Sequence, residues 1–292
     1  MSAIEPLKPR WGRHLFLSAF TLLALYPVFW VIAIALSGQQ DLALSTLPAD
    51  PGLWDRVRAV LPVPDQVSLT NFSGVLAEQA LGRWLLNSLI VSGLTTVVGV
   101  MLACTAAYAF ARFRFPGRRA GMVMFLVGQM YPVTLMMVPL YVIVVEWLNL
   151  GNGYIGLVLV YSITSIPFCV WMLKGYIETI PYEIEESALM DGASRFMIFY
   201  RIVLPLSQPA IAVTALFSFM TAWNEFILAA IFMEQESAYT APVGLRFLVG
   251  DYTASWGHFA AGSIIVSLPV VALFYALQRT LVSGLSAGGV KS

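Results

Sequence analysis

Six stretches of the sequence are apolar almost without interruption, and each is about 20 residues long or longer. A helix of about 20 residues spans roughly 30 Å of hydrocarbon, so each stretch predicts a transmembrane helix. The ten-residue alternation of a membrane barrel is not seen, and unpaired backbone is too costly in lipid. The pattern therefore predicts an all-α, polytopic membrane protein with six transmembrane helices, at residues 15–36, 85–111, 121–145, 154–175, 210–232 and 259–281.

Composition agrees with this fold class. Of the 292 residues, 59% are hydrophobic and 11% are charged, and the mean hydropathy of +0.80 excludes an ordinary soluble domain. The formal net charge is zero, so no basic surface indicates nucleic acid as a partner. Cys104 and Cys169 lie within apolar runs without metal or redox spacing, and we expect both in the core. The first apolar stretch lacks a small-residue cleavage site at its end, so we expect it to stay attached as a span.

The basic residues predict the orientation in the membrane. With the N-terminus inside, 12 of the 16 Lys and Arg residues lie on the cytoplasmic side, and only Arg56, Arg58, Arg83 and Arg246 lie outside. Both termini are then cytoplasmic. The chain divides into an N-terminus with the first span, a polar external loop, a core transmembrane domain that includes a cytoplasmic loop at 177–209, and a C-terminal tail. These parts cover residues 1–36, 37–84, 85–281 and 282–292. In the external loop, residues 69–76 predict a short helix.

The loop at 177–209 alternates charged and apolar residues. Pro181 suits a helix start, acidic residues crowd the next turn, and Gly192 offers a stop, which predicts a helix over 181–191. Ser194 can cap a second helix that ends at Leu204 and Pro205. Four apolar residues of this second helix are expected near one face: Phe196, Phe199, Tyr200 and Val203.

The spacing of Glu186, Ser187 and Ala188, then Gly192, then Ile202 with Leu204-Pro205 resembles the Glu-Ala-Ala loop of ABC importer permeases. Ser187 stands where that family usually has its first alanine. The resemblance implies the MetI-like permease fold and a loop that docks on a separate ATPase. The residues that it implies for this coupling are Glu185, Glu186, Ser187, Ala188, Asp191, Gly192, Ile202, Leu204 and Pro205.

Two further stretches, AYAFARFRFPGRRAG at 107–121 and GQMYP at 128–132, are similar to MalG-type permeases of the carbohydrate importers. That resemblance implies import of a neutral oligosaccharide, maltose or maltodextrin first and trehalose as the alternative, across the inner membrane. It implies a MalF-like second permease, two copies of a MalK-like ATPase, and an external sugar-binding protein. The sequence has no nucleotide-binding Gly-Lys-Ser/Thr loop and no catalytic or metal-ligand set, so we expect a transport subunit without a cofactor, with ATP and Mg used by the partner.

The resemblance also extends to the last external loop and to the tail. It implies contact with the binding protein through Asp251, Tyr252, Trp256 and Gly257, although Trp256 and Tyr252 also suit membrane-interface anchors. The tail resembles MalG-type endings, which implies contact with the ATPase through Gly288, Gly289, Val290 and Lys291. Composition alone predicts a frayed terminus there.

Uncharged polar residues near Pro132, Pro139 and Pro167 suit a neutral, hydroxyl-rich solute, although such residues also hold helices together. The candidate translocation pathway is Gln129, Tyr131, Asn224 and Glu225. A carboxylate within a span must be paired, protonated or wet, so Glu225 is either a pathway residue or an interhelical hydrogen-bond partner. The alternative functions are an ion-coupled secondary transporter that uses Glu225, which would need inverted repeats and more intramembrane charges, and an intramembrane enzyme, which would need paired catalytic groups.

Overall fold

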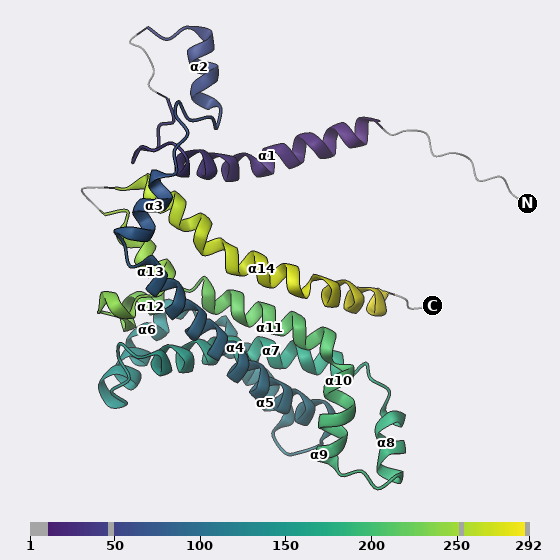
Figure 1. Ribbon diagram of the computed structural model, residues 1–292. Helices are drawn as coiled ribbons and strands as arrows, with labels where there is room; N and C mark the ends of the chain where they lie inside the picture. The colour runs from purple at the N-terminus through teal and green to yellow at the C-terminus, as the bar shows by residue number, and fades with distance from the viewer. Residues whose placement is uncertain (1–10, 46–49, 251–253, 290–292) are drawn as a thin grey trace, which may run out of the picture. The chain divides into compact units, whose positions relative to one another are not determined.

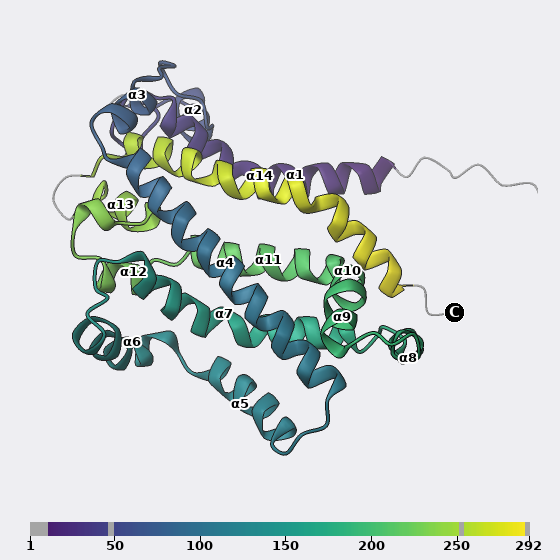
Figure 2. The same cartoon turned by 60° about the horizontal axis from the view of Figure 1, so that its bottom comes forward.

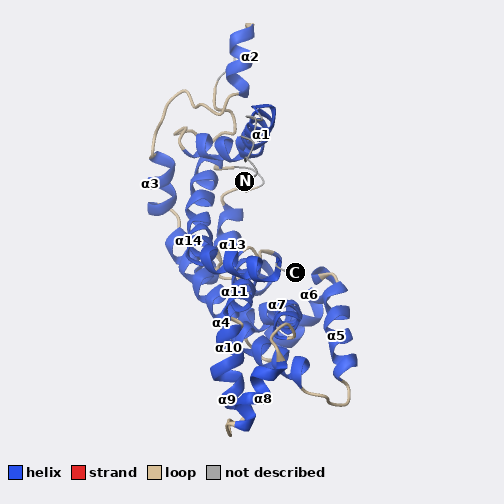
Figure 3. Cartoon of the chain, turned by 90° about the vertical axis from the view of Figure 1, so that its right-hand side faces the viewer, coloured by secondary structure: helices blue, strands red, loops and turns tan. Residues whose placement is uncertain are grey.

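The computed structural model describes residues 11–45, 50–250 and 254–289, with side chains described as far as residue 278. Within these residues every regular element is a helix, which confirms the all-α prediction (Figure 3). The chain forms two compact units. One unit comprises residues 1–79 and 246–265, and the other comprises residues 80–245 and 266–292.

The first unit contains α1 (Trp11–Ala35), α2 (Leu53–Val60), α3 (Thr70–Ala77) and the beginning of α14 (Trp256–Gly289) (Figure 1). The buried Asn71 holds it together, because its amide donates to the carbonyls of Ile34 and Ala35 at the end of α1. Helix α3 confirms the short helix expected in the external loop. Helix α2 was not predicted, although Gly52 starts it and Asp55 receives the Gly52 N–H at 2.9 Å.

The second unit is built around three long helices, α4 (Leu81–Arg112), α7 (Tyr154–Ile177) and α11 (Gln208–Trp223), which pack on one another (Figure 2). Small residues allow the three helices to approach closely. A Cβ at Gly99 of α4 would lie within 3.6 Å of the hydroxyls of Ser165 in α7 and Ser218 in α11. The other elements are α5 (Arg118–Met130), α6 (Val133–Tyr141), η1 (Val142–Trp147), α8 (Tyr182–Met190), α9 (Arg195–Ile198), η2 (Phe199–Val203), α10 (Leu204–Leu206), α12 (Ile227–Phe232), η3 (Glu236–Ala238) and α13 (Ala241–Phe247), the last at the boundary between the units.

The described residues contain four helices long and apolar enough to cross a membrane, α1, α4, α7 and Trp256–Gln278 of α14. The number rises to six if each of two bent pairs of helices forms one span. This agrees with the predicted polytopic membrane protein. Cys104 and Cys169 are buried and free, as expected for core residues.

Two of the six expected helices are not continuous. The expected helix at 121–145 breaks between α5 and α6 with a bend of 99°. Pro132 causes this break, since it lacks an N–H and disfavours the helical conformation of Tyr131, whose ψ is 127°. The expected helix at 210–232 ends at Trp223 and resumes at Ile227. By contrast, Pro139 and Pro167 lie inside α6 and α7 without ending them.

The expected end of the second loop helix at Leu204-Pro205 is also wrong. Helical backbone continues through Pro205 to Leu206, because a proline is tolerated in the first turn of a helical segment. The chain then turns at Ser207 by 77° into α11.

Candidate functional site

The loop that carries the Glu-Ala-Ala spacing folds as two short helices. Helix α8 follows Pro181 and has Glu183 and Glu185 in its first turn, which confirms the helix predicted there. Gly192 follows with φ +86°, a left-handed conformation that ends the helix and favours glycine. The Ser194 hydroxyl accepts the N–H of Met197 at 3.3 Å and caps α9, as predicted.

The four residues expected near one face of the second loop helix differ in exposure. Its buried residues are Ile198 and Val203, whereas Phe196 and Tyr200 are exposed. The backbone widens into the π-helical turns of η2 at Phe199–Val203, so the ordinary helical period does not hold along this segment. The apolar residues therefore divide between the core and the outer surface.

The loop presents apolar side chains to the outside. Met190 is 89% exposed, Phe196 is 75% exposed and Tyr200 is 64% exposed. The rings of Phe196 and Tyr200 are stacked with their centroids 6.4 Å apart. We call Met190, Phe196 and Tyr200 the loop surface. Large apolar groups exposed together beside charged residues are typical of a protein contact.

The residues expected to act in coupling fall into three groups by exposure. Ala188, Ile202 and Leu204 are half-buried, and Glu185 is fully buried. The remaining expected residues are exposed: Glu186, Ser187, Asp191, Gly192 and Pro205. The loop therefore divides into an outward part around Glu186 and an inward part around Glu185.

Glu185 faces inward and is bound by the end of α4. The Arg112 Nε lies 2.5 Å from Glu185 Oε1, and the Tyr108 hydroxyl donates to Oε2 at 3.1 Å. The same guanidinium donates through Nη2 to the carbonyl of Ile180 at 2.9 Å and lies 5.6 Å from the ring centroid of Tyr182. Sequence reasoning missed this contact, since Arg112 reads as one basic residue of a cytoplasmic turn.

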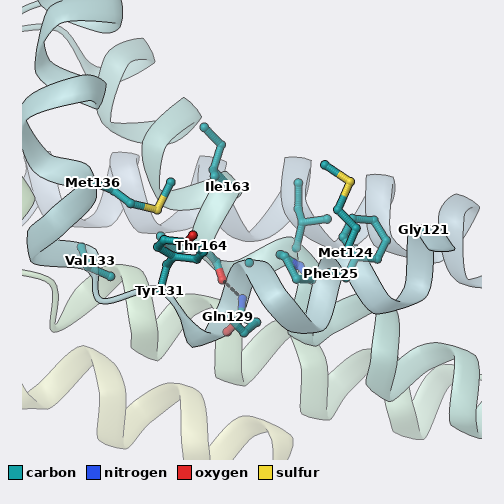
Figure 4. Close-up of a pocket in the computed structure, with 12 residues that line it drawn as sticks. Gly121, Met124, Phe125, Gln129, Tyr131, Val133, Met136, Ile163 and Thr164 are labelled. Atoms are coloured by element: carbon teal, nitrogen blue, oxygen red, sulfur yellow. Dashed lines mark hydrogen bonds between the residues drawn. The ribbon is translucent and has the colours of Figure 1, made fainter.

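Gln129 and Tyr131 line a pocket of about 530 Å³ formed by α5, α6 and α7 (Figure 4). The Gln129 amide donates to the carbonyl of Thr164 at 2.8 Å, which fixes its orientation at the pocket wall. Phe125, Met124 and Met136 supply apolar surface, and none of the twelve lining residues is charged. The break in the helix at Pro132 opens this space. A pocket of this kind suits a neutral ligand with apolar faces and hydroxyl groups.

Glu225 and Asn224 are not among the residues that line this pocket. The Glu225 carboxylate accepts the hydroxyl of Tyr161 at 2.8 Å and the N–H groups of Leu228 and Ala229 at 2.8 and 3.0 Å. It therefore caps α12 and ties that helix to α7. The Asn224 amide donates to the carbonyl of Met220 at 2.9 Å. Of the two interpretations of Glu225, this geometry favours the interhelical hydrogen-bond partner.

The remaining expected contact residues are only partly described. Asp251 and Tyr252 lie outside the described residues, and so do Val290 and Lys291. Trp256 and Gly257 begin α14, where a Cβ at Gly257 would lie 2.3 Å from the carbonyl oxygen of Gln39. Gly257 thus allows a close approach of two backbones. Gly288 and Gly289 form the last residues of α14, so helix extends further into the tail than composition predicts.

Comparison with known proteins decides the family. Residues 72–286 match the family described as binding-protein-dependent transport system inner membrane component. The chain belongs to this family. The curated relatives of this membrane permease include the galactooligosaccharides transport system permease protein GanQ of Bacillus subtilis, which is 36% identical over 95% of this chain and 94% of its own. The maltose/maltodextrin transport system permease protein MalG of Escherichia coli K12 is 35% identical over 95% and 94%.

One further relative agrees in type, and one solved structure agrees in fold. The maltodextrin permease protein MalD of Streptococcus pneumoniae is 36% identical over 77% of this chain and 80% of its own. A chain in the crystal structure of a bacterial ABC transporter that imports the acidic polysaccharide alginate superposes with a TM-score of 0.76, over 95% of this chain and 99% of that one. The identity is 19%, so this likeness concerns the fold. Among the described residues, no group of three or more His, Cys, Asp or Glu side chains could hold a metal ion.

Proposed function

We propose that this chain is a permease subunit of an ATP-driven importer for a neutral oligosaccharide, with maltose or a maltodextrin as the first substrate class and trehalose as an alternative. The curated relatives with maltose, maltodextrin or galactooligosaccharide in their names support an oligosaccharide substrate. The uncharged pocket around Gln129 and Tyr131 supports a neutral one. Stacking faces and amide or hydroxyl groups are what such a sugar needs along its path.

The loop surface is the observation that carries the coupling assignment. Met190, Phe196 and Tyr200 are exposed beside Glu186 and Gly192, the residues that match the Glu-Ala-Ala spacing. Aromatic and methionine side chains on a short helical projection fit a cleft in a partner protein. In the proposed assembly that partner is a cytoplasmic ATPase. Closure of the ATPase dimer on ATP moves the loop, and the spans repack from an inward-facing to an outward-facing arrangement.

The remaining partners follow from the same assembly. One chain carries one coupling loop, whereas an ATPase dimer offers two docking clefts, so we propose a second, MalF-like permease and two MalK-like ATPase copies. An external sugar-binding protein delivers the substrate, and the region before α14, with Trp256 and Gly257, is its proposed contact. Both termini and the loop then lie on the cytoplasmic side of the inner membrane, as the distribution of basic residues predicts.

The decisive experiment is ATP hydrolysis in proteoliposomes that contain this chain with its co-purifying partners. Hydrolysis is measured with and without a sugar-loaded external binding protein, for maltose, maltotriose and trehalose. We expect one loaded binding protein to raise the rate and sugar to accumulate inside only with ATP. Sugar uptake without ATP, driven by a proton gradient, would overturn the proposal.

A further inference from the structure

The buried contact between α4 and α8 indicates that α4 is the long helix that moves together with the loop. We propose that Arg112 and Glu185 form the joint through which α8 moves α4, so that these two positioning residues link ATP hydrolysis to the opening of the pathway. This inference rests on the proposed function and deepens it. It concerns the inward part of the loop, which faces away from the proposed ATPase contact.

The Arg112–Glu185 pair is isolated from solvent. The Glu185 side chain is 0% exposed and the Arg112 side chain is 7% exposed. Removing two charges from water is costly unless the geometry is good and the remaining polar atoms are satisfied. Both carboxylate oxygens of Glu185 have donors, Arg112 at 2.5 Å and the Tyr108 hydroxyl at 3.1 Å. A buried pair with these contacts has one favourable arrangement, so it resists sliding of α8 along the end of α4.

Arg112 and Tyr108 both lie at the end of α4 that contacts the loop. Arg112 is the last residue of α4, and it reaches the connection before α8 at Ile180, as well as Tyr182 and Glu185 within α8. Tyr108 lies one turn earlier on α4, and its ring also packs on Phe199 of the second loop helix with centroids 5.0 Å apart. Residues on one end of α4 therefore hold both helices of the loop.

Away from this end, α4 contacts the other long helices of its unit. Along its length α4 packs on α7 and on α11, the other two long helices of this unit. A displacement of α8 that carries the end of α4 would change both of these contacts together. By comparison, Arg118 of α5 lies 3.5 Å from Glu178, the residue that follows α7. The side chains of this second pair are 33% and 40% exposed, respectively. Such an exposed pair restrains little.

The test uses neutral substitutions that separate coupling from folding. Removal of one partner leaves a buried unpaired charge, and that variant can fail to assemble. The decisive variant is therefore the double change Arg112→Gln with Glu185→Gln, which leaves no unpaired charge and keeps side chains of similar length. The matched control is Arg118→Gln with Glu178→Gln, which removes the same charges from the exposed pair and also breaks the exposed contact between Lys174 and Glu178. Sugar transported per ATP hydrolysed is measured for both assembled complexes.

We expect the buried-pair variant to assemble with the ATPase and hydrolyse ATP, while sugar transported per ATP falls about tenfold. The exposed-pair control is expected to keep the wild-type ratio. A purely structural role predicts fewer assembled complexes with an unchanged ratio. An assembled buried-pair variant with the wild-type ratio would therefore overturn the inference.

A second measurement is independent of transport. Nitroxide labels at the exposed Ser187 of α8 and Thr105 of α4 report the distance between the two helices, with Cys104 and Cys169 replaced by alanine. In the chain alone, we expect a narrow distance distribution that broadens in Arg112→Gln with Glu185→Gln and stays narrow in the control. An unchanged distribution would contradict the joint even if no ATPase partner were found, whereas failure of the wild-type chain to bind any ATPase would contradict only the proposed function.

Discussion

At the residue scale, the contacts of Glu225 favour a structural role for this carboxylate within an apolar stretch. Its two oxygens accept three hydrogen bonds, from Tyr161 and from the first free N–H groups of α12. Glu225 is partly buried, and these three donors stabilise its carboxylate without a cation. These contacts hold α12 against α7. They lie at the break between α11 and α12, where the fifth apolar stretch is not helical.

This role predicts different effects for two substitutions. Glu225→Gln keeps one acceptor oxygen and leaves one backbone N–H group of α12 without its acceptor, a small loss, so ATP-dependent sugar uptake should stay within about threefold of the wild type. Glu225→Ala leaves three donors unpaired and should lower the free energy of unfolding by about 2–3 kcal/mol. Uptake into vesicles and thermal unfolding in detergent measure the two effects. Loss of uptake in Glu225→Gln, together with sensitivity to a protonophore, would instead support ion coupling.

At the element scale, the two short loop helices present an apolar surface that the rest of the described chain does not cover. Phe196→Ala with Tyr200→Ala removes two exposed rings that stack on each other and touch little else. Truncating one central aromatic at an interface costs about 2 kcal/mol or more, so ATPase affinity should fall at least about 30-fold. The yield and thermal stability of the chain should change little.

The control for this prediction is Trp147→Ala, which removes a ring that is 75% exposed but lies in η1 rather than in the loop. Co-purification and surface plasmon resonance with the ATPase subunit measure the affinity. Equal losses of affinity in the control and in the loop variant would indicate a general effect of exposed aromatic groups. Unchanged affinity in the loop variant would remove the docking role of the loop surface.

The elements also show what the sequence can predict. Local signals at Pro181, Gly192 and Ser194 located the loop helices correctly, because helix starts and ends depend on nearby residues. The face of the second helix was mispredicted, since a π-helical turn changes the period without a sequence signal. The Arg112–Glu185 pair joins residues 73 positions apart, and no local pattern reveals such a contact. Pro132 breaks a long helix, whereas Pro139 and Pro167 lie inside helices that continue through them, so packing rather than the residue type decides between a break and a tolerated proline.

At the scale of the whole molecule, the described residues contain the loop surface and the pocket beside the α5–α6 break, and in the proposed importer these two features belong to one half of an alternating-access transporter. Two docking clefts on an ATPase dimer require a second loop, and a pathway on the axis between two permeases requires a second wall. We therefore expect purification from native membranes to give one copy of this chain, one copy of a different permease and two copies of the ATPase. Native mass spectrometry measures this stoichiometry directly. A complex with two copies of this chain would contradict the heterodimer, and its two identical loops would then serve both clefts.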